Sequence, residues 1–255
     1  MKTDFKVVIP ARYASSRLPG KPLLNLAGRP MIEHVYRCAQ ESGAQQVVVA
    51  TDDLRIQEAC LKFGAEVCMT AENHPSGTDR IAEVVSLMCW PDSSIVINLQ
   101  GDEPLMPPGL IVQLAEDMAK HQDAGIATLC TPIHTAADLL DPHIVKVVMD
   151  EQGYALYFSR AAIPWDRNAF EITTAELPRN SRHYRHIGLY AYHAGFIRRY
   201  SQLAPCYIEI TESLEQLRAL WHGVKIHVSI TETPPGHGVD TEKDLERVAG
   251  LIEKR

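Results

Sequence analysis

The stretch VVIPARYASSRLPGK, from Val7 to Lys21, joins two patterns that together indicate the fold. Its first three residues form an apolar, β-branched run of the kind found in a buried strand. Pro10 ends that run, and the eleven residues after it include Arg12, Arg17 and Lys21 but no acidic residue. The sequence therefore predicts a strand that carries a cationic loop at its carboxyl end.

The same alternation continues outward from this stretch. Apolar β-branched runs predict strands at residues 6–11, 45–51, 65–70, 93–100 and 125–133. Helical periodicity predicts the helices between them, at residues 30–43, 54–64, 79–89 and 110–122. Repeats of this length imply parallel pairing with right-handed crossovers. We therefore expect an α/β fold, a mostly parallel sheet flanked by helices, with ligands at the carboxyl ends of its strands.

The second half of the chain follows a different pattern. A Glu-Gln-Gly turn predicts a hairpin over residues 145–159, and the aperiodic residues 167–185 predict a mobile loop. A strand (187–193), a helix (210–223), a strand (224–230) and a last helix (241–254) are expected to follow. Because no linker or repeat divides the chain, we predict a single domain, 1–255, with an inserted subregion at approximately 142–205.

The composition excludes several classes of protein. The 255 residues include 25 basic and 32 acidic ones, and a net charge of -7 argues against a nucleic-acid binder. Neither a signal-peptide core nor a run of roughly 18 apolar residues occurs, so we expect a cytoplasmic protein without a membrane partner. The six cysteines are scattered without a CxxC pair and are expected to be structural.

The basic loop lacks both common phosphate-binding motifs. Lys21 is followed by Pro22 instead of Ser or Thr, and G-x-G-x-x-G is absent. Two guanidiniums, an ammonium and backbone N–H groups nevertheless suit a phosphate chain. The alternative is a solvated basic loop.

A second candidate feature is VINLQGDEPL, residues 96–105, where an apolar run ends in Asp102 and Glu103. A carboxylate just beyond a central strand can hold Mg²⁺, which needs only one or two protein oxygens besides substrate phosphates. The alternative is an acidic turn in solvent.

Two predicted helix starts are the remaining candidates. Ser76 or Thr78 can cap the helix that follows HPSG, where Gly77 would let a ligand approach the backbone. Asp240 precedes the last helix, where it either caps that helix or provides a second metal carboxylate.

Taken together, these segments resemble the 3-deoxy-manno-octulosonate cytidylyltransferase family, the CMP-Kdo synthetases of lipopolysaccharide synthesis. The resemblance runs nearly end to end, through VVIPARYASSRLPGKPL, SGTDRIAEV, VINLQGDEP, GYALYFSRAAIPW, HIGLYAYHAGFIRRY, LEQLRALWHG and GVDTEKDLERV. It implies a nucleotide-diphospho-sugar transferase-like, Rossmann-type fold. It also implies that CTP and 3-deoxy-manno-octulosonate (Kdo) give CMP-Kdo and diphosphate, with Mg²⁺ as cofactor.

The resemblance further implies roles for individual residues. Lys21, Asp102 and Asp240 would be catalytic, and the two aspartates would bind the metal. The nucleotide would be bound by Ala11, Arg12, Arg17, Lys21, Ser76, Gly77, Arg80 and Gln100. The sugar acid would be bound by Arg160, His186, Tyr190, Glu215 and Gln216.

Some alternatives stay open at this level. A cytidylyltransferase for sialic acid or 8-amino-Kdo would share the loop and the metal carboxylates, whereas a non-catalytic nucleotide-binding module would not need both carboxylates. The family resemblance implies a homodimer. The segment IGLYAYHAGFIRRYSQL, residues 187–203, could form its interface or could be internal.

Overall fold

The structure, a computed structural model, describes residues 3–14, 18–167, 177 and 182–254. Its contacts divide the chain into two compact units, which are described separately. The first unit comprises Met1–Ala119, Leu189–Gln202 and Pro235–Arg255, and the second comprises Lys120–Gly188 and Leu203–Pro234. The predicted single domain with an inserted subregion stays a prediction, because two compact units can form within one domain.

The first unit is built on parallel strands. Strands β1 (Phe5–Ala11), β4 (Gln46–Thr51), β5 (Glu66–Met69) and β6 (Ile95–Asn98) lie in the order β6-β1-β4-β5, all parallel. The Leu189–His193 part of β10 (Tyr184–His193) adds an antiparallel strand beside β6. A short hairpin of β2 (Asn25–Leu26) and β3 (Arg29–Pro30) stands apart from this sheet. The parallel α/β prediction is confirmed here.

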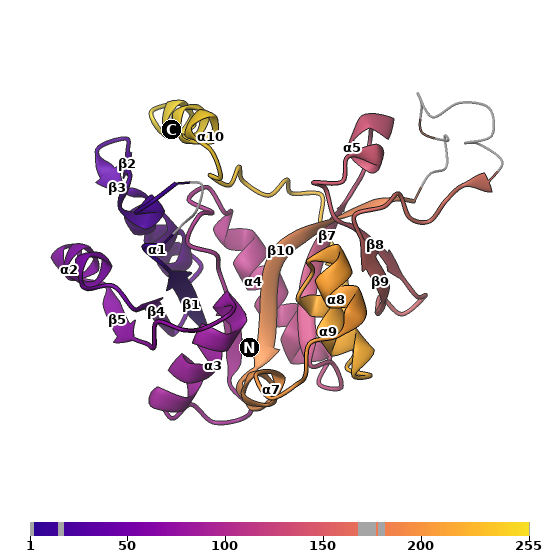
Figure 1. The fold of residues 1–255 in the computed structure, drawn as a ribbon, viewed down its shortest axis with the longest axis horizontal. Helices are drawn as coiled ribbons and strands as arrows, with labels where there is room; N and C mark the ends of the chain where they lie inside the picture. The colour runs from indigo at the N-terminus through magenta and orange to yellow at the C-terminus, as the bar shows by residue number, and fades with distance from the viewer. Residues whose placement is uncertain (1–2, 15–17, 168–176, 178–181, 255) are drawn as a thin grey trace. The chain divides into compact units, whose positions relative to one another are not determined.

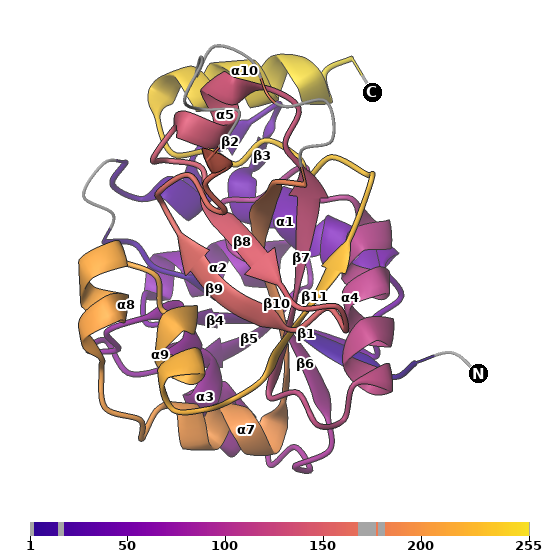
Figure 2. The same cartoon turned by 90° about the vertical axis from the view of Figure 1, so that its right-hand side faces the viewer.

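Helices cover both faces of these strands. Figures 1 and 2 show α1 (Met31–Glu41) and α2 (Leu54–Lys62) on one side of β1 and β4, and α3 (Gly77–Leu87) on the other. Helix α7 (Ala194–Tyr200) packs beside α3. Helices α4 (Pro108–Lys120) and α10 (Glu242–Ile252) complete the described helices of this unit. Because β1 is buried on both faces, the side chains of Val7, Val8 and Ile9 are fully covered, as their β-branched run predicts.

The second unit contains the predicted hairpin. Strands β8 (Lys146–Met149) and β9 (Ala155–Ser159) pair antiparallel and lie side by side in Figure 2. Strand β8 also pairs with Tyr184–Arg185 of β10, and β7 (Ile126–Pro132) pairs in parallel with β11 (Ile226–Ile230). A short helix, α5 (Ala136–Leu140), follows β7. Most of the predicted loop at 167–185 lies outside the described residues.

The predicted helix at 210–223 is wrong as a single helix. The chain forms α8 (Tyr207–Glu212) and α9 (Gln216–Trp221), separated at Ser213, which has the left-handed angles φ 52° and ψ 49°. Such a residue ends a helix because its amide and carbonyl no longer follow the helical path. Glu209 and Arg218 bridge the two helices through a buried ion pair of 2.5 Å.

The predicted dimer surface at residues 187–203 is mostly internal. The side chains of Leu189, Tyr192 and Ile197 are at most 2% exposed within the single chain. Most of the segment is therefore internal, and a dimer contact of its exposed residues stays a prediction.

Among the described residues, no helix combines the length and the apolar character that crossing a membrane requires.

Candidate active site

A hollow of about 320 Å³ lies at the carboxyl ends of β1 and β6, the edge at which a ligand is expected. Both strands run in the same direction, so the residues that follow them meet there. The hollow is lined by Pro10, Ala11, Arg12, Ala14, Lys21, Pro22, Gln100, Gly101, Asp102 and Asp240. Six of the predicted site residues are thus brought together. Arg17, predicted to bind the nucleotide, lies outside the described residues.

The centre of the hollow is an arrangement of one ammonium and two carboxylates. The Nζ atom of Lys21 lies 2.6 Å from Oδ2 of Asp102 and 3.1 Å from Oδ1 of Asp240. These residues are 81 and 219 positions apart in sequence. Two carboxylates that converge on one cation offer hard oxygen ligands within reach of a common point.

An apolar cluster holds these three residues in place. Leu18, Leu105 and Val239 pack into one buried cluster with residues of β2, α1 and α10. Each of the three is within three positions of Lys21, Asp102 or Asp240 in sequence. In addition, the backbone N–H of Val239 donates to the carbonyl of Asp102 at 2.9 Å. The two carboxylate segments are therefore fixed to each other directly.

Two glycines allow the segments around the hollow to approach so closely. A Cβ atom at Gly101 would lie 2.9 Å from the carbonyl oxygen of Pro10, closer than side chains come to backbone. A Cβ atom at Gly236 would collide with the carbonyl of Leu105. Sequence reasoning did not single out either residue, although Gly101 stands between polar residues just after a strand.

The start of α3 lies near two residues that line the hollow, Pro10 and Gln100. Of the two predicted cap candidates, Ser76 is the N-cap of α3: its hydroxyl accepts a hydrogen bond from the N–H of Asp79 at 3.1 Å. The backbone of Gly77 lies against Pro10, because a Cβ atom there would be 3.4 Å from the proline ring and 3.9 Å from Oε1 of Gln100. The side chain of Gln100 in turn donates to Asn98 at 3.0 Å. A nucleotide contact of Ser76, Gly77 or Gln100 stays a prediction.

Arg80 is fully buried one turn into α3. Its guanidinium pairs with Asp52 at 3.2 Å and also donates to Thr70. Asp52 therefore compensates for a cation in the first turn of a helix, where it is otherwise unfavourable. A contact between Arg80 and the nucleotide base stays a prediction.

Asp240 does not cap the last helix. The N-cap of α10 is Thr241, whose hydroxyl accepts from the N–H of Asp244 at 3.2 Å in a capping box. The capping interpretation of Asp240 is wrong because the cap position falls one residue later. The Asp240 carboxylate faces Lys21 instead.

In the second unit, Arg160 follows β9 and is held by backbone carbonyls. Its guanidinium donates to the carbonyls of Glu212 at 2.8 Å and Pro142 at 3.0 Å. The Glu212 carboxylate accepts from the hydroxyl of Ser159 at 2.6 Å and from the N–H of Arg160 at 2.9 Å. Glu212 was not predicted, and its position before LEQLR was the only available signal.

His186 is a buried, neutral histidine within β10. Its Nε2 lies 2.9 Å from the hydroxyl of Thr128, and its ring meets that of Phe158 edge to face. Burial lowers the pKa of His186 to about 3. Glu215 and Gln216 begin α9 in the second unit, and Tyr190 lies, buried, in the first unit's part of β10. Sugar binding by these residues stays a prediction.

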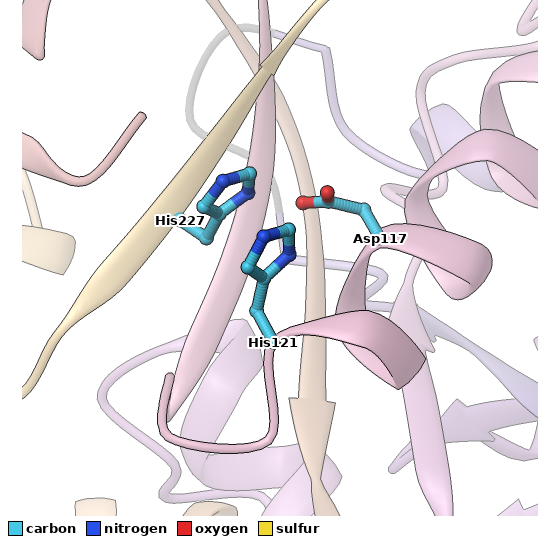
Figure 3. A group of neighbouring side chains, drawn as sticks. All are labelled: Asp117, His121 and His227. Carbon is cyan, nitrogen blue, oxygen red and sulfur yellow. The ribbon is translucent and has the colours of Figure 1, made fainter. Parts of the chain in front are cut away.

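Two histidines with metal-binding chemistry lie side by side in the second unit. The rings of His121 and His227 stack at 3.5 Å with their planes 14° apart (Figure 3). His121 follows the last residue of α4, and His227 lies in β11. A metal ion binds an imidazole nitrogen in the ring plane at about 2.0–2.1 Å. Two parallel stacked planes share no such point. As these rings lie, the pair is an aromatic stack and not a metal centre.

The comparisons with known proteins agree over nearly the whole chain. Residues 6–226 match the family described as Cytidylyltransferase. The 3-deoxy-manno-octulosonate cytidylyltransferase of Nitrosococcus oceani is 58% identical over 98% of this chain and 96% of its own. The protein of the same name from Pseudomonas syringae pv. tomato is 56% identical over 99% of this chain and all of its own.

Solved structures give the same result. A CMP:2-keto-3-deoxy-manno-octonic acid synthetase in complex with CTP matches with a TM-score of 0.89 and 43% identity, over 98% of this chain and 99% of that one. A cytidylyltransferase from Leptospira borgpetersenii serovar Hardjo-bovis matches with a TM-score of 0.63, over 99% of this chain and 87% of that one. At 15% identity, the second match shows the fold alone.

Proposed function

We propose, from the premise that this chain belongs to the cytidylyltransferase family and within it to the 3-deoxy-manno-octulosonate cytidylyltransferases, that the hollow at β1 and β6 binds CTP for transfer to Kdo. The reaction is CTP plus Kdo to CMP-Kdo plus diphosphate. The observation that carries this proposal is the meeting of Lys21, Asp102 and Asp240 beside the loop that follows β1. A nucleotide-binding module without catalysis would not require this pair of carboxylates.

The residues of the hollow suit a triphosphate and a divalent cation. Asp102 and Asp240 would hold Mg²⁺, because both carboxylates reach one common cation and Mg²⁺ prefers a few carboxylate oxygens together with phosphate oxygens. When bound, Mg²⁺ supplies Lewis-acid stabilisation of phosphate charge.

The chain's own groups have separable tasks in the transfer. The anomeric hydroxyl of the sugar forms a bond to the α-phosphorus of CTP, loses its proton, and the bond to the diphosphate breaks. Lys21 would stabilise negative charge that grows on the departing diphosphate, since an ammonium beside developing charge favours the transition state over bound CTP. Arg12 and the backbone of Ala11 would position the triphosphate along the loop.

Sugar recognition would use the second unit. The planar guanidinium of Arg160 matches a carboxylate, which both Kdo and its analogues carry. Arg160 is fixed by the carbonyls of Glu212 and Pro142, so its direction is set before a ligand arrives. We infer that this preorientation is the task of Glu212.

A substrate panel tests the proposed function. Diphosphate release is measured with CTP, ATP, GTP or UTP against Kdo, 8-amino-Kdo and sialic acid, at several Mg²⁺ concentrations. We expect turnover with CTP and Kdo that depends on Mg²⁺. Binding of CTP without diphosphate release from any sugar acid would support the non-catalytic alternative, and a preference for sialic acid or 8-amino-Kdo would change the substrate.

We further propose a cytoplasmic homodimer that supplies CMP-Kdo for lipopolysaccharide synthesis. None of the six cysteines, all within the described residues, forms a disulfide, which suits a reducing compartment. The predicted subregion 142–205 exposes Leu156 at 61% and Trp165 at 56% of their surfaces, and large exposed apolar side chains favour an interface. Sedimentation velocity of the wild type and of Leu156→Asp would test this: a monomeric wild type contradicts the dimer.

A further inference from the structure

The loop between β1 and Lys21 is closed at its base by Tyr13. The N–H of Gly20 donates to the carbonyl of Tyr13 at 3.0 Å. The ring of Tyr13 also lies against Gly20, because a Cβ atom on that glycine would be only 3.0 Å from the ring. Gly20 has φ +66°, a conformation that favours glycine, and Lys21 follows it directly. The position of Tyr13 therefore fixes Gly20, and through it the backbone of Lys21.

The ring of Tyr13 is itself held from α2. The guanidinium of Arg55 lies over the ring, 3.3 Å from its centre. Arg55 is fixed by two hydrogen bonds to Asp53, of 2.6 and 3.0 Å, in a fork that only a guanidinium can make. Asp53 is the N-cap of α2 and accepts from the N–H of Arg55 at 2.9 Å. The hydrogen bond with Arg55 also lowers the pKa of Asp53.

This arrangement does not line the hollow. Neither Tyr13 nor Arg55 is among the residues that line it. The neighbouring Asp52 pairs with the buried Arg80. The turn of Asp52 and Asp53, which follows β4, thus supports both the loop with Lys21 and the start of α3.

We propose that Asp53, Arg55 and Tyr13 form a clamp that positions Lys21 for the transfer reaction. The three are positioning residues, since they act through Gly20 and Lys21. The inference rests on the proposed function for its kinetic consequence, and on the structure alone for its effect on the loop. The clamp therefore links the N-terminus of α2 to the position of the Lys21 ammonium.

The variants Arg55→Met and Tyr13→Leu each remove one half of the clamp. We expect each to lower kcat by about two- to fivefold, the factor expected for an exposed cation–aromatic pair, with a smaller change in the KM for CTP. Tyr13→Phe keeps the ring and should retain wild-type kcat. Asp53→Asn still caps α2 but loses the charge that fixes Arg55, so it should resemble Arg55→Met.

Arg37→Met is the matched control. Arg37 is similarly exposed on α1 and makes two hydrogen bonds to Glu33, of 3.0 and 2.8 Å, away from the hollow. Its loss should leave kcat unchanged. An equal fall in kcat for Arg37→Met would show that the loss of any surface arginine pair suffices, and would overturn the clamp.

A double-mutant cycle and amide exchange complete the test. If the two side chains act together, the double variant Tyr13→Leu/Arg55→Met should lose no more kcat than either single variant. Losses that multiply would overturn the proposal. Without any substrate, the amide of Gly20 should exchange faster in Arg55→Met than in Arg37→Met, and equal exchange would also overturn it. If the wild-type protein has no transferase activity but the two variants still differ in exchange at Gly20, the proposed function is refuted and the clamp is not.

Discussion

At the scale of single residues, the site depends on charges that compensate one another. Asp102 and Asp240 both lie within 3.1 Å of the Lys21 ammonium, and without it the two carboxylates would repel each other. The same logic applies to Arg80, which is fully buried and paired with Asp52. Lys21 and Arg80 are therefore each located by acids from a distant part of the sequence.

Lys21→Ala tests the proposed task of the ammonium. We expect kcat to fall by roughly 100-fold or more with a smaller change in the KM for CTP, because the charge acts mainly on the transition state. Steady-state kinetics with saturating Kdo measure both parameters, with Lys62→Ala on α2 as the control. A rise in KM at constant kcat would make Lys21 a binding residue only.

Asp240→Asn tests the metal role, which the structure has already separated from capping. The capping box of Thr241 and Asp244 stays intact, so the melting temperature should not change. Turnover should fall by roughly 10² to 10³, since a Lewis-acid contribution of several kcal/mol is weakened. Raising Mg²⁺ should restore part of it by mass action. Superimposable curves of kcat against Mg²⁺ for wild type and variant would remove Asp240 from the site.

At the scale of elements, the local sequence pattern agrees with the structure for the strands of the first unit and fails for one helix of the second. Strands β1, β4 and β6 are short, β-branched apolar runs that become buried, and their length and composition indicate buried strands. Residues 210–223 also have a helical pattern, yet Ser213 breaks it. Glu209, which lies before the break, pairs with Arg218 beyond it, and this buried pair requires the turn.

Ser213→Gly should stabilise the protein. A non-glycine residue with left-handed angles pays a conformational penalty that glycine avoids, although glycine also gains freedom in the unfolded chain. We expect a net gain of about 0.5–1 kcal/mol in the free energy of unfolding. Urea titration measures it, with Ser213→Ala as the control that keeps the penalty. A loss of stability in Ser213→Gly would contradict the strain at this position.

At the scale of the whole molecule, burial decides how stability depends on pH. His186 has its pKa lowered to about 3 by burial, whereas an unfolded chain binds a proton at this residue near pH 6.5. Below pH 6.5 the unfolded state therefore holds a proton that the native state rejects. The contribution of the buried, neutral His186 to the free energy of unfolding is complete above pH 6.5 and is lost as the pH falls toward 3.

His186→Gln tests this linkage. Between pH 7 and pH 5, His186 should lower the free energy of unfolding by about 2 kcal/mol, a loss that glutamine cannot show. Urea unfolding of both proteins at half-unit steps of pH measures the difference. Parallel curves for the two proteins would show that His186 is not kept neutral by the fold.

The alternation of strands and helices in the first half of the chain and the hairpin follow from sequence alone, because each depends on neighbours within a few residues. The motifs around Lys21, Asp102 and Asp240 likewise identify the family. Local pattern also places Asp102 just after a strand, which is the information a site prediction needs first.

Only the tertiary structure decides which of these groups meet. The convergence of Lys21 with two acids 81 and 219 positions away, and the clamp of Tyr13 by Arg55, depend on packing between distant segments. The same holds for the internal position of residues 187–203, which sequence could not distinguish from an interface. Periodicity reports that an apolar face is buried, whereas only the packed chain determines what buries it.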